Sequence, residues 1–430
     1  MSSTGWSDRT ISAGRASIEG RTHGPRAFLP FVGPALIASI AYMDPGNFAT
    51  NIEAGAKYGY MLLWVVLFAN IAAMLFQAQS ARMGIVTGAS LATLAARHYP
   101  KPIVYFMWIV SEIGAMATDL AEFLGAAIGM SLLSGLPLMT CLVLTGVATY
   151  LILGLQGAGF RPMEALISAF IGVIGASYVV ELWIAPPDWS AALSGVVTPR
   201  LTDARSVALA VGVIGATIMP HAIYLHSNLT RDRVPMNNAR ETRRVLWFSN
   251  LEVLLALGFA GLVNMAMVCM SASVFHAGNP DVAEIETAYH TLAPLLGNAA
   301  AAVFMISLLA SGLSSSVVGT MAGQSIMQDF VRFRVPLWLR RLLTMIPAFV
   351  VVALGYGATD ALVMSQIVLS IVLPVPMIAL LHLGARRDIM GEFVNGPAMR
   401  IASLVAAAII LALNAVLLLS AAGVEIPGLG

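Results

Sequence analysis

Eleven apolar stretches, each long enough to cross a lipid bilayer as a helix, dominate this chain of 430 residues. Only 10% of its residues are charged, whereas a soluble domain carries about 25%. We therefore predict an all-α membrane protein with eleven transmembrane helices joined by short loops. The predicted spans are 28–54, 60–83, 102–131, 135–155, 162–184, 204–229, 246–271, 287–318, 338–356, 359–384 and 399–421.

Lysine and arginine residues fall almost entirely on one side of these spans. If the N-terminus lies in the cytoplasm, 20 of the 23 basic residues lie in cytoplasmic segments. The three on the outer side are Lys57, Arg200 and Arg205. Because cytoplasmic loops are rich in Lys and Arg, we predict a cytoplasmic N-terminus and an extracytoplasmic C-terminus. Residues 1–27 are polar and lack the apolar core of a signal peptide, so we interpret them as a cytoplasmic tail.

Two of the spans are interrupted by tetrapeptides that contain proline. Asp44–Asn47 is Asp-Pro-Gly-Asn, and Met219–Ala222 is Met-Pro-His-Ala. Proline removes a backbone donor from a helix, so Pro45, Gly46 and Pro220 mark points where helices 1 and 6 unwind in mid-membrane. Within a bilayer such breaks are tolerated only where they are buried in protein or line a cavity. A matched pair of broken helices indicates a transporter whose substrate binds between them.

The broken spans begin two halves of the chain that enter the membrane from opposite sides. Residues 28–184 hold helices 1–5, an extracellular loop covers 185–203, and residues 204–384 hold helices 6–10. This arrangement predicts an inverted repeat of five plus five helices. Residues 385–430 then carry helix 11 and the C-terminus. The two halves share no obvious sequence identity, so the prediction depends on the breaks and the topology.

The residues at the breaks suit a transition-metal ion. Asp44 and Asn47 offer hard oxygen ligands, and the breaks free backbone carbonyls near Ala41 and Ala216. Met219 adds a soft thioether, and this mixed set favours Mn²⁺ and Fe²⁺ over Mg²⁺ and Ca²⁺, which prefer oxygen alone. A structural alternative is that Asp44 only caps the second half-helix, a role compatible with ligation. For Met219 the alternative is ordinary packing.

Two amides on other spans are further candidates. Gln366 lies in the span 359–384 and Asn264 in the span 246–271, and either could add an oxygen ligand. Hydrogen bonding between helices explains both equally well. The small residues of the run 311–316 indicate close helix packing.

The third span carries carboxylates on one helical face. Glu112, Asp119 and Glu122 are spaced by seven and three residues, which indicates a proton or ion path through the membrane. The alternative is a structural polar network, with Arg341 as a possible partner. His221 follows the second break and could exchange a proton at physiological pH, although a lone histidine is often only hydrogen-bonded.

Several classes of protein are excluded by what the sequence lacks. No Gly-Lys-[Ser/Thr] phosphate loop and no His-Glu-x-x-His helix is present, which argues against an ATPase and a zinc protease. We predict no enzymatic activity and no cofactor. The net charge of +1 gives no indication of a nucleic-acid partner. Nothing in the sequence requires an oligomer, so we expect a monomer in the lipid bilayer.

Three motifs make the chain similar to a known family. They are Asp44–Asn47, the run Met219–Ser227 with Met-Pro-His followed by Tyr-Leu-His-Ser, and the segment Gly312–Phe330, GLSSSVVGTMAGQSIMQDF. From about residue 27 onward the chain resembles the natural resistance-associated macrophage protein (Nramp) family of proton-coupled divalent metal transporters, in its bacterial manganese branch. Ala222 stands where many members of that family carry asparagine.

The resemblance implies an eleven-helix LeuT-like fold, alternating access, and import of Mn²⁺, Fe²⁺ and related ions with protons across a bacterial inner membrane. It implies metal ligation by Asp44, Asn47, Met219, the carbonyls of Ala41 and Ala216, and Gln366 in some states. It implies proton handling by Asp44, Asp119, Glu122 and His221. Two alternatives remain open, a sodium-coupled amino-acid transporter of the same architecture and a metal-gated channel or sensor.

Overall fold

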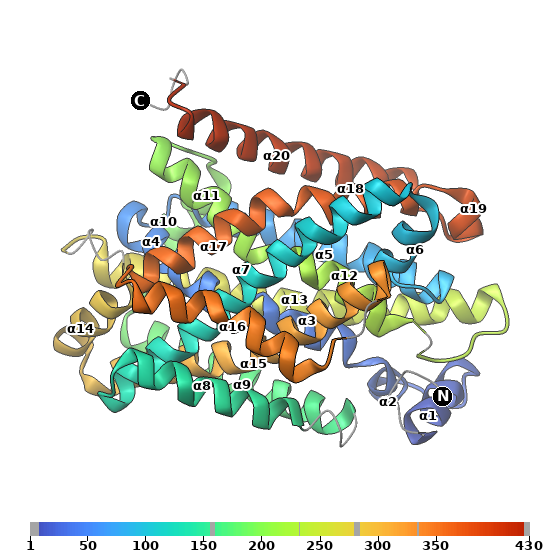
Figure 1. Ribbon diagram of the computed structural model, residues 1–430, viewed down its shortest axis with the longest axis horizontal. Helices are drawn as coiled ribbons and strands as arrows, with labels where there is room; N and C mark the ends of the chain where they lie inside the picture. Colours follow the sequence, from blue (N-terminus) through green and yellow to red (C-terminus); the bar gives the residue numbers. More distant parts are fainter. Residues whose placement is uncertain (1–7, 155–159, 232, 279–283, 333–334, 425–430) are drawn as a thin grey trace.

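The computed structural model describes residues 8–154, 160–231, 233–278, 284–332 and 335–424. All regular secondary structure in these ranges is helical, which confirms the predicted all-α class. The long helices run roughly along the longest axis of the molecule, and α1 and the C-terminal end of α20 lie at opposite ends of it (Figure 1). The first seven residues of the predicted tail lie outside the described ranges.

Each of the eleven predicted stretches overlaps one long helix or two consecutive helices. The helices are α3 (Pro34–Ala41) and α4 (Pro45–Tyr58), α5 (Leu63–Thr87), α7 (Lys101–Ser134), α8 (Leu138–Gly154), α9 (Phe160–Ile184), α11 (Ala204–Thr217) and α12 (Pro220–Thr230), α13 (Ala239–Phe275), α15 (Asn298–Val331), α16 (Leu337–Ala353), α17 (Ala358–Val372) and α18 (Pro374–Gly384), and α20 (Pro397–Ala421). Among the described residues, eight helices or helix pairs are long and apolar enough to cross a membrane. The other three stretches hold the shorter helices α3 with α4, α8 and α16.

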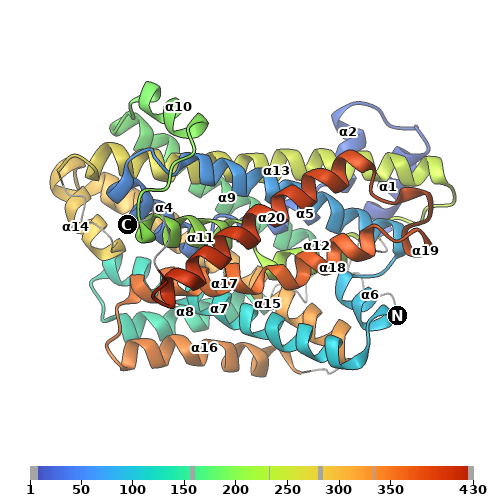
Figure 2. The ribbon, with the colours of Figure 1, turned by 90° about the horizontal axis from the view of Figure 1, so that it is seen from above.

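The short helices sort to the two ends of the molecule. One end holds α1 (Asp8–Ile18), α2 (Pro25–Phe28), α6 (Leu91–His98) and α19 (Arg387–Met390), with the 3₁₀ turns η1 (Leu29–Phe31) and η3 (Gly391–Phe393). The other end holds α10 (Trp189–Val197) and α14 (Ile285–Leu296) (Figures 1 and 2). Segments that the basic residues assign to one side of the membrane therefore lie at one end.

The predicted span 287–318 is wrong at both ends. Residues 285–296 form the separate helix α14, and the long helix α15 begins only at Asn298 and continues to Val331. Gly297 divides the two helices with a φ of 94°, a left-handed conformation that favours glycine. Hydropathy stays high across this turn, so an apolar window cannot detect it.

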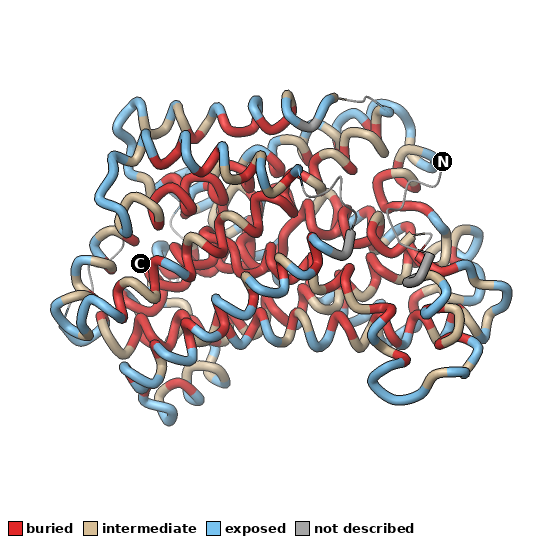
Figure 3. Tube along the Cα trace, turned by 90° about the horizontal axis from the view of Figure 1, so that it is seen from below, coloured by how far each residue is buried: buried red, intermediate tan, exposed pale blue. Residues whose placement is uncertain are grey.

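Burial places the two broken helix pairs at the centre. In the most apolar window of the α11–α12 pair 94% of residues are buried, whereas in that of α20 only 28% are. Figure 3 shows the buried chain running through the middle of the molecule, with exposed residues at the ends and outer helices. The helix α13 packs on α4 and α5, and α15 packs along α7. These helices enclose both breaks.

Candidate functional site at the two helix breaks

The first break separates α3 from α4. Proline disfavours the helical conformation in the residue before it, and Asp44 is accordingly extended, with φ −78° and ψ 168°. Its Oδ1 accepts a hydrogen bond from the backbone N–H of Asn47 at 2.8 Å, which caps α4. Asp44 therefore has the capping role considered from the sequence. Its Oδ2 is buried and has no hydrogen-bond partner among the described residues, so one oxygen remains for another ligand.

Neighbouring helices hydrogen-bond the backbone that the first break exposes. Asn264 of α13 donates through Nδ2 to the carbonyl of Tyr42 at 2.8 Å, and Ser311 of α15 donates to the carbonyl of Met43 at 2.5 Å. The sequence offered hydrogen bonding as one role for Asn264 and only packing for Ser311. Buried backbone carbonyls require such partners, so these two side chains stabilise the unwound turn.

Both breaks free a carbonyl at the same position relative to a proline. In a continuous helix the carbonyls of Ala41 and Ala216 would accept from the N–H groups four residues later, which are positions 45 and 220. Both positions are proline and have no N–H. The carbonyl of Ala216 instead accepts a bond from Asn47 Nδ2 at 3.1 Å. This is a physical basis for the two carbonyl ligands predicted from the sequence.

Asn47 links the two breaks. Its Nδ2 donates to Asp44 Oδ1 at 2.7 Å as well as to the carbonyl of Ala216, and its Oδ1 accepts from Thr217 Oγ1 at 3.3 Å. The helix α11 ends at Thr217 and α12 begins at Pro220, so Met219 lies in the extended link, fully buried. Thr217 was not among the predicted site residues.

Gln366 of α17 lies against the first break. A methyl group at position 46 would lie 2.0 Å from Gln366 Nε2, so glycine at this position lets the amide lie directly against the break. Gln366 Nε2 donates to Ser365 Oγ at 2.9 Å, while its buried Oε1 has no partner among the described residues. An acceptor oxygen from each of Asp44 and Gln366 is thus left available to a cation.

The third-span carboxylates separate into two groups. Asp119 Oδ1 accepts from Nη1 of the buried Arg341 of α16 at 2.9 Å. Both Glu122 oxygens are buried without hydrogen-bond partners in the described part of the chain, and a methyl group at Gly319 would lie 2.5 Å from Glu122 Oε2 and 3.1 Å from Asp119 Oδ1. Glu112 instead pairs with Arg340 Nη2 at 2.7 Å.

The helix α7, which carries the carboxylates, contacts the first break directly. A methyl group at Gly125 would lie 2.1 Å from Pro45 Cβ, so glycine lets α7 pack against the start of α4. Glu122 lies about one helical turn from that contact. On the other side, His221 Nδ1 is 3.1 Å from Thr118 Oγ1, next to Asp119 in the sequence. The first turn of α12 and the carboxylates of α7 are therefore neighbours.

A second polar chain was not predicted from the sequence. His226 Nδ1 donates to Gln77 Oε1 at 2.8 Å, and Gln77 Nε2 donates to the hydroxyl of Tyr42 at 2.5 Å. All three side chains are buried. Gln77 in an apolar span was the available signal, because an intramembrane amide requires a partner. This chain ties α12 through α5 to the residue that follows α3.

The chemistry of the breaks is mixed rather than acidic. Among the described residues no three His, Cys, Asp or Glu side chains cluster as a metal site. The donors predicted for a cation at the breaks are instead one carboxylate, two amides, one thioether and two backbone carbonyls. This donor set fits an ion of intermediate softness.

Comparison with known proteins identifies the family. Residues 35–420 match the family described as natural resistance-associated macrophage protein-like, Nramp. The chain belongs to the Nramp family. The family assignment confirms the resemblance drawn from the three motifs. The matched range includes both breaks, the carboxylates of α7 and Gln366.

Relatives of this Nramp chain are named as metal transporters. It is 58% identical over 422 residues to a Verminephrobacter eiseniae protein named divalent metal cation transporter MntH, covering 98% of this chain and 96% of that one. A crystal structure of the Eremococcus coleocola manganese transporter, in complex with an aromatic bis-isothiourea substituted compound, matches with a TM-score of 0.83 and 31% identity, covering 91% of this chain and 87% of that chain. These names support the prediction that the Nramp chain is a transporter and not an enzyme.

A more distant likeness concerns the fold alone. The structure of a nucleobase-cation-symport-1 family transporter in a closed conformation matches the Nramp chain with a TM-score of 0.58 at 12% identity. It covers 93% of this chain and 94% of that one. The likeness is consistent with the predicted LeuT-like fold, and it carries no information on the substrate.

Proposed function

We propose that this protein is a secondary transporter that imports Mn²⁺, and also Fe²⁺ and related transition-metal ions, together with protons by alternating access. The observation that carries the proposal is the meeting of the two breaks at Asn47, beside the unpaired oxygens of Asp44 and Gln366. The names of its relatives support a divalent metal cation as substrate. An inside-negative potential of 100 mV would favour entry of a divalent ion by about 4.6 kcal/mol.

In this proposal the metal binds in mid-membrane between the halves of helices 1 and 6. Its ligands are Asp44, Asn47, Met219 and the carbonyls of Ala41 and Ala216, and Gln366 joins in some states. When the ion binds, the hydrogen bonds from Asn47 Nδ2 to Asp44 Oδ1 and to the carbonyl of Ala216 would be replaced by bonds from these ligands to the ion. The thioether of Met219 would disfavour Ca²⁺ and Mg²⁺.

The proposed proton path leaves the breaks along α7. Asp44 and Glu122 are its inner carboxylates, and the Asp119–Arg341 pair and His221 continue it. The Glu112–Arg340 pair lies two turns further along the same helix. Buried carboxylates beside a cation site couple metal and proton movement, because a bound cation displaces the proton of a neighbouring carboxyl group onto this path.

The proposed membrane arrangement has eleven spans in a five-plus-five inverted repeat with α20 appended. Helices 1 and 6 are the pairs α3–α4 and α11–α12. We place the N-terminus in the cytoplasm and the C-terminus outside a bacterial inner membrane, and we propose a monomer. The segregation of short helices to the two ends of the molecule supports this sidedness.

The two alternatives make different demands on the site. An amino-acid transporter would present a half-helix N-terminus and hydroxyls to the substrate carboxylate. Here the N-terminus of α4 is already capped by the Asp44 carboxylate, which would repel such a substrate. A channel or sensor for metal ions would need no coupling to protons, so a measurement of proton movement during metal uptake distinguishes it from the proposed transporter.

The deciding experiment is Mn²⁺ uptake into proteoliposomes with the luminal pH recorded at the same time. We expect uptake with acidification, and both should be lost in Asp44→Ala and Asp44→Asn. The matched control is Asp360→Asn, because Asp360 is an exposed carboxylate in the first turn of α17. This variant should transport like the unmodified protein.

Other outcomes of this experiment assign other functions. Uptake without acidification would identify a uniporter or a channel. No uptake of Mn²⁺, Fe²⁺ or Cd²⁺ would contradict the proposal and favour the amino-acid transporter. Equal loss in Asp44→Asn and Asp360→Asn would show that the first break has no special role.

A further inference from the structure

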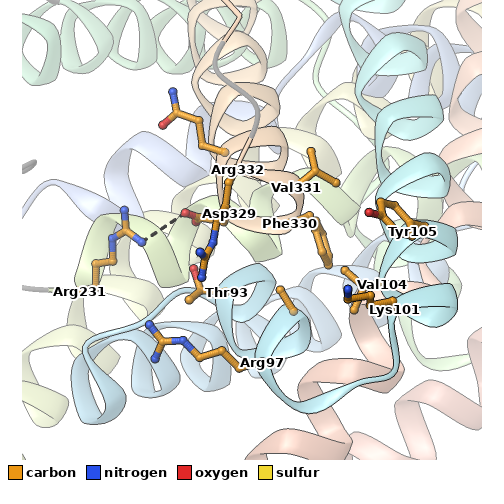
Figure 4. A pocket seen from close by; sticks show the side chains of 12 residues that line it. Thr93, Arg97, Lys101, Val104, Tyr105, Arg231, Asp329, Phe330, Val331 and Arg332 are labelled. Carbon is orange, nitrogen blue, oxygen red and sulfur yellow. Dashed lines mark hydrogen bonds and ion pairs between the residues drawn. The ribbon is translucent and has the colours of Figure 1, made fainter.

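A second candidate site lies away from the breaks, at the end of the molecule that carries α6 and α19. A cavity of about 490 Å³ opens between α6, the start of α7, the end of α15 and the residue that follows α12 (Figure 4). Its lining includes four basic side chains and one carboxylate: Arg97, Lys101, Arg231, Arg332 and Asp329. The proposed orientation places this cavity, which we call the basic cavity, at the cytoplasmic face.

The carboxylate of the basic cavity is already engaged. Asp329 Oδ2 accepts from Ser90 Oγ at 2.6 Å, and Asp329 Oδ1 lies 3.5 Å from Arg231 Nη1. Within the part of the chain that the structure describes, the other three basic residues form no ion pair with a carboxylate. The basic cavity therefore carries a surplus of three positive charges, from Arg97, Lys101 and Arg332.

The backbone at the end of α15 is in an uncommon conformation. Arg332 follows Val331 with φ 57° and ψ 17°, and it is the only non-glycine residue with a positive φ in the described ranges. An L-residue there costs roughly 1 kcal/mol or more, and the conformation usually belongs to glycine or asparagine. A long basic side chain at this position lies on the wall of the basic cavity. Figure 4 shows Arg97, Arg231 and Arg332 gathered on one side and Lys101 with Tyr105 on the other.

The chemistry of the walls suits a phosphate group. Guanidinium groups bind phosphate oxygens in pairs, and an ammonium supplies a compact positive charge. The helix α7 begins at Lys101, so the positive end of its dipole lies near the same wall. Thr93 and Tyr105 add hydroxyl donors. The proposed transport of metal cations gives no reason for a cluster of basic side chains and hydroxyl groups in this cavity.

An apolar surface adjoins the basic cavity. On the first turns of α7, Ile103, Tyr105 and Phe106 are large side chains with about half of their surface exposed. In a bilayer such a surface contacts acyl chains, and basic pockets between transmembrane helices at the cytoplasmic side bind anionic headgroups. A phospholipid could therefore place its phosphate in the cavity and its chains along α7.

We propose that the basic cavity binds a phosphate group through Arg97, Lys101 and Arg332. The group belongs to an anionic phospholipid of the inner leaflet or to a soluble phosphate compound, and both sources present the same chemistry. The opposing interpretation is that these basic residues only keep their loops on the cytoplasmic side of the membrane and offset the negative end of the α15 dipole. That interpretation requires no binding.

The test measures binding to the purified full chain by native mass spectrometry at a fixed salt concentration. The probes are phosphatidylglycerol, the zwitterionic phosphatidylcholine, and glycerol phosphate as the soluble source. The site variant is Arg97→Gln/Arg332→Gln. Its control is Arg387→Gln/Arg400→Gln, which removes two exposed arginines at the same end but outside the cavity. A third variant, Arg97→Lys/Arg332→Lys, keeps the charge.

We expect the site variant to bind phosphatidylglycerol at least about tenfold more weakly, since each basic residue near an anionic group contributes roughly fivefold. The control variant should bind normally, and the lysine variant should retain most of the affinity. The same pattern with glycerol phosphate alone would support the proposal with a soluble source. Equal effects of the two glutamine variants, equal loss in the lysine and glutamine variants, or no preference over phosphatidylcholine would overturn it.

Thermal stability of each variant separates loss of a ligand from loss of fold. The two arginines replaced in the cavity, Arg97 and Arg332, make no ion pair within the described residues, so melting temperatures without added lipid should be unchanged. Added phosphatidylglycerol should raise the melting temperature of the unmodified protein and of the control, because a ligand that binds only the folded state stabilises it. No such rise in the unmodified protein would also overturn the proposal.

Discussion

At the scale of single residues, Met219 is the donor that sets the expected choice of metal. It is the only thioether in the extended link between α11 and α12. We predict that Met219→Ala admits Ca²⁺ and reduces the preference for Mn²⁺ over Ca²⁺ by about tenfold or more, while Mn²⁺ uptake falls less. The reason is that a site of oxygen donors alone no longer excludes a hard cation. Competition of Ca²⁺ against Mn²⁺ uptake in proteoliposomes measures the change.

The control for Met219 must remove the same side chain elsewhere in the core. Met345 of α16 is buried, and its Cε would lie 2.7 Å from a methyl group at Gly146 of α8, far along the chain from both breaks. Met345→Ala should lower stability by about 2–5 kcal/mol through a cavity and leave metal selectivity unchanged. Continued exclusion of Ca²⁺ by Met219→Ala would contradict the soft-ligand argument.

Asp119 is the residue that distinguishes a proton path from a structural ion pair. Its partner Arg341 is completely buried and also donates to Ser316 Oγ at 2.9 Å. We predict that Asp119→Asn changes the pH dependence of Mn²⁺ uptake and lowers proton flux, while Mn²⁺ binding remains largely intact. Uptake and luminal pH recorded over a series of external pH values provide the measurement.

Stability must be measured beside the flux in that experiment. Removing one partner leaves the Arg341 charge buried without its carboxylate, which costs about 3–5 kcal/mol. The double variant Asp119→Asn/Arg341→Gln removes both charges and should recover part of this loss. If the double variant regains stability and normal proton flux returns with it, the pair is structural and carries no protons.

At the scale of elements, the N-terminus of α3 is fixed by hydrogen bonds with side chains of other segments. Glu252 Oε1 of α13 accepts from the backbone N–H groups of Gly33 and Ala35 at 2.6 and 3.0 Å. Arg233 Nη2 donates to the carbonyls of Pro30 and Val32. The half-helix before the first break is thus fixed at its free end by charged side chains, and alternating access in the proposed mechanism would require their release.

We predict that Glu252→Gln loosens α3 without unfolding the rest. A charged acceptor contributes about 1.5–3 kcal/mol to such hydrogen bonds, so amide exchange over residues 33–41 should rise by about tenfold or more. Hydrogen exchange with mass spectrometry measures this. The control is Glu241→Gln, near the start of the same helix α13, where the carboxylate is half-buried and pairs with Arg15. Equal exchange of α3 in both variants would contradict a holding role for Glu252.

The elements also show why proline alone does not predict a break. Pro45 and Pro220 each begin a new helix after a break, yet Pro347 lies inside the continuous helix α16. At Pro374 the residue before it keeps helical angles, φ −52° and ψ −38°, so α17 and α18 follow each other without unwinding. At the first break, side chains on α13 and α15 satisfy the exposed carbonyls, and these partners come from distant parts of the chain.

At the scale of the whole molecule, local rules predicted the spans and the two breaks, and tertiary packing decided the remainder. Helical spacing placed Glu112 and Asp119 on one face, but only the position of α16 pairs them with different arginines. The proximity of Gln366 to Gly46 likewise depends on how α17 packs against α4. The sequence stays apolar on both sides of Gly297, so its hydropathy could not predict that α15 begins there.

The sidedness of the molecule is the prediction on which import and the cytoplasmic position of the basic cavity both depend. Cysteine reporters can test it, because the native Cys141 and Cys269 are both buried. We expect Val424→Cys, beyond α20, to react with a membrane-impermeant maleimide in intact cells. Arg387→Cys, exposed in α19, should react only after permeabilisation.

The reason for this expectation is energetic and applies to the molecule as a unit. With 20 of 23 basic residues in the segments predicted to be cytoplasmic, the opposite orientation would place nearly all of these segments on the outer side, against an inside-negative potential. The two reporters lie on opposite sides only if α20, the long helix between them, crosses the membrane, and Val424 lies outside only if the molecule inserts in the predicted direction. Labelling of Arg387→Cys in intact cells, with Val424→Cys protected, would reverse the orientation and make the proposed transport outward. Labelling of both reporters in intact cells would contradict the span between α19 and the C-terminus, and with it the eleventh helix.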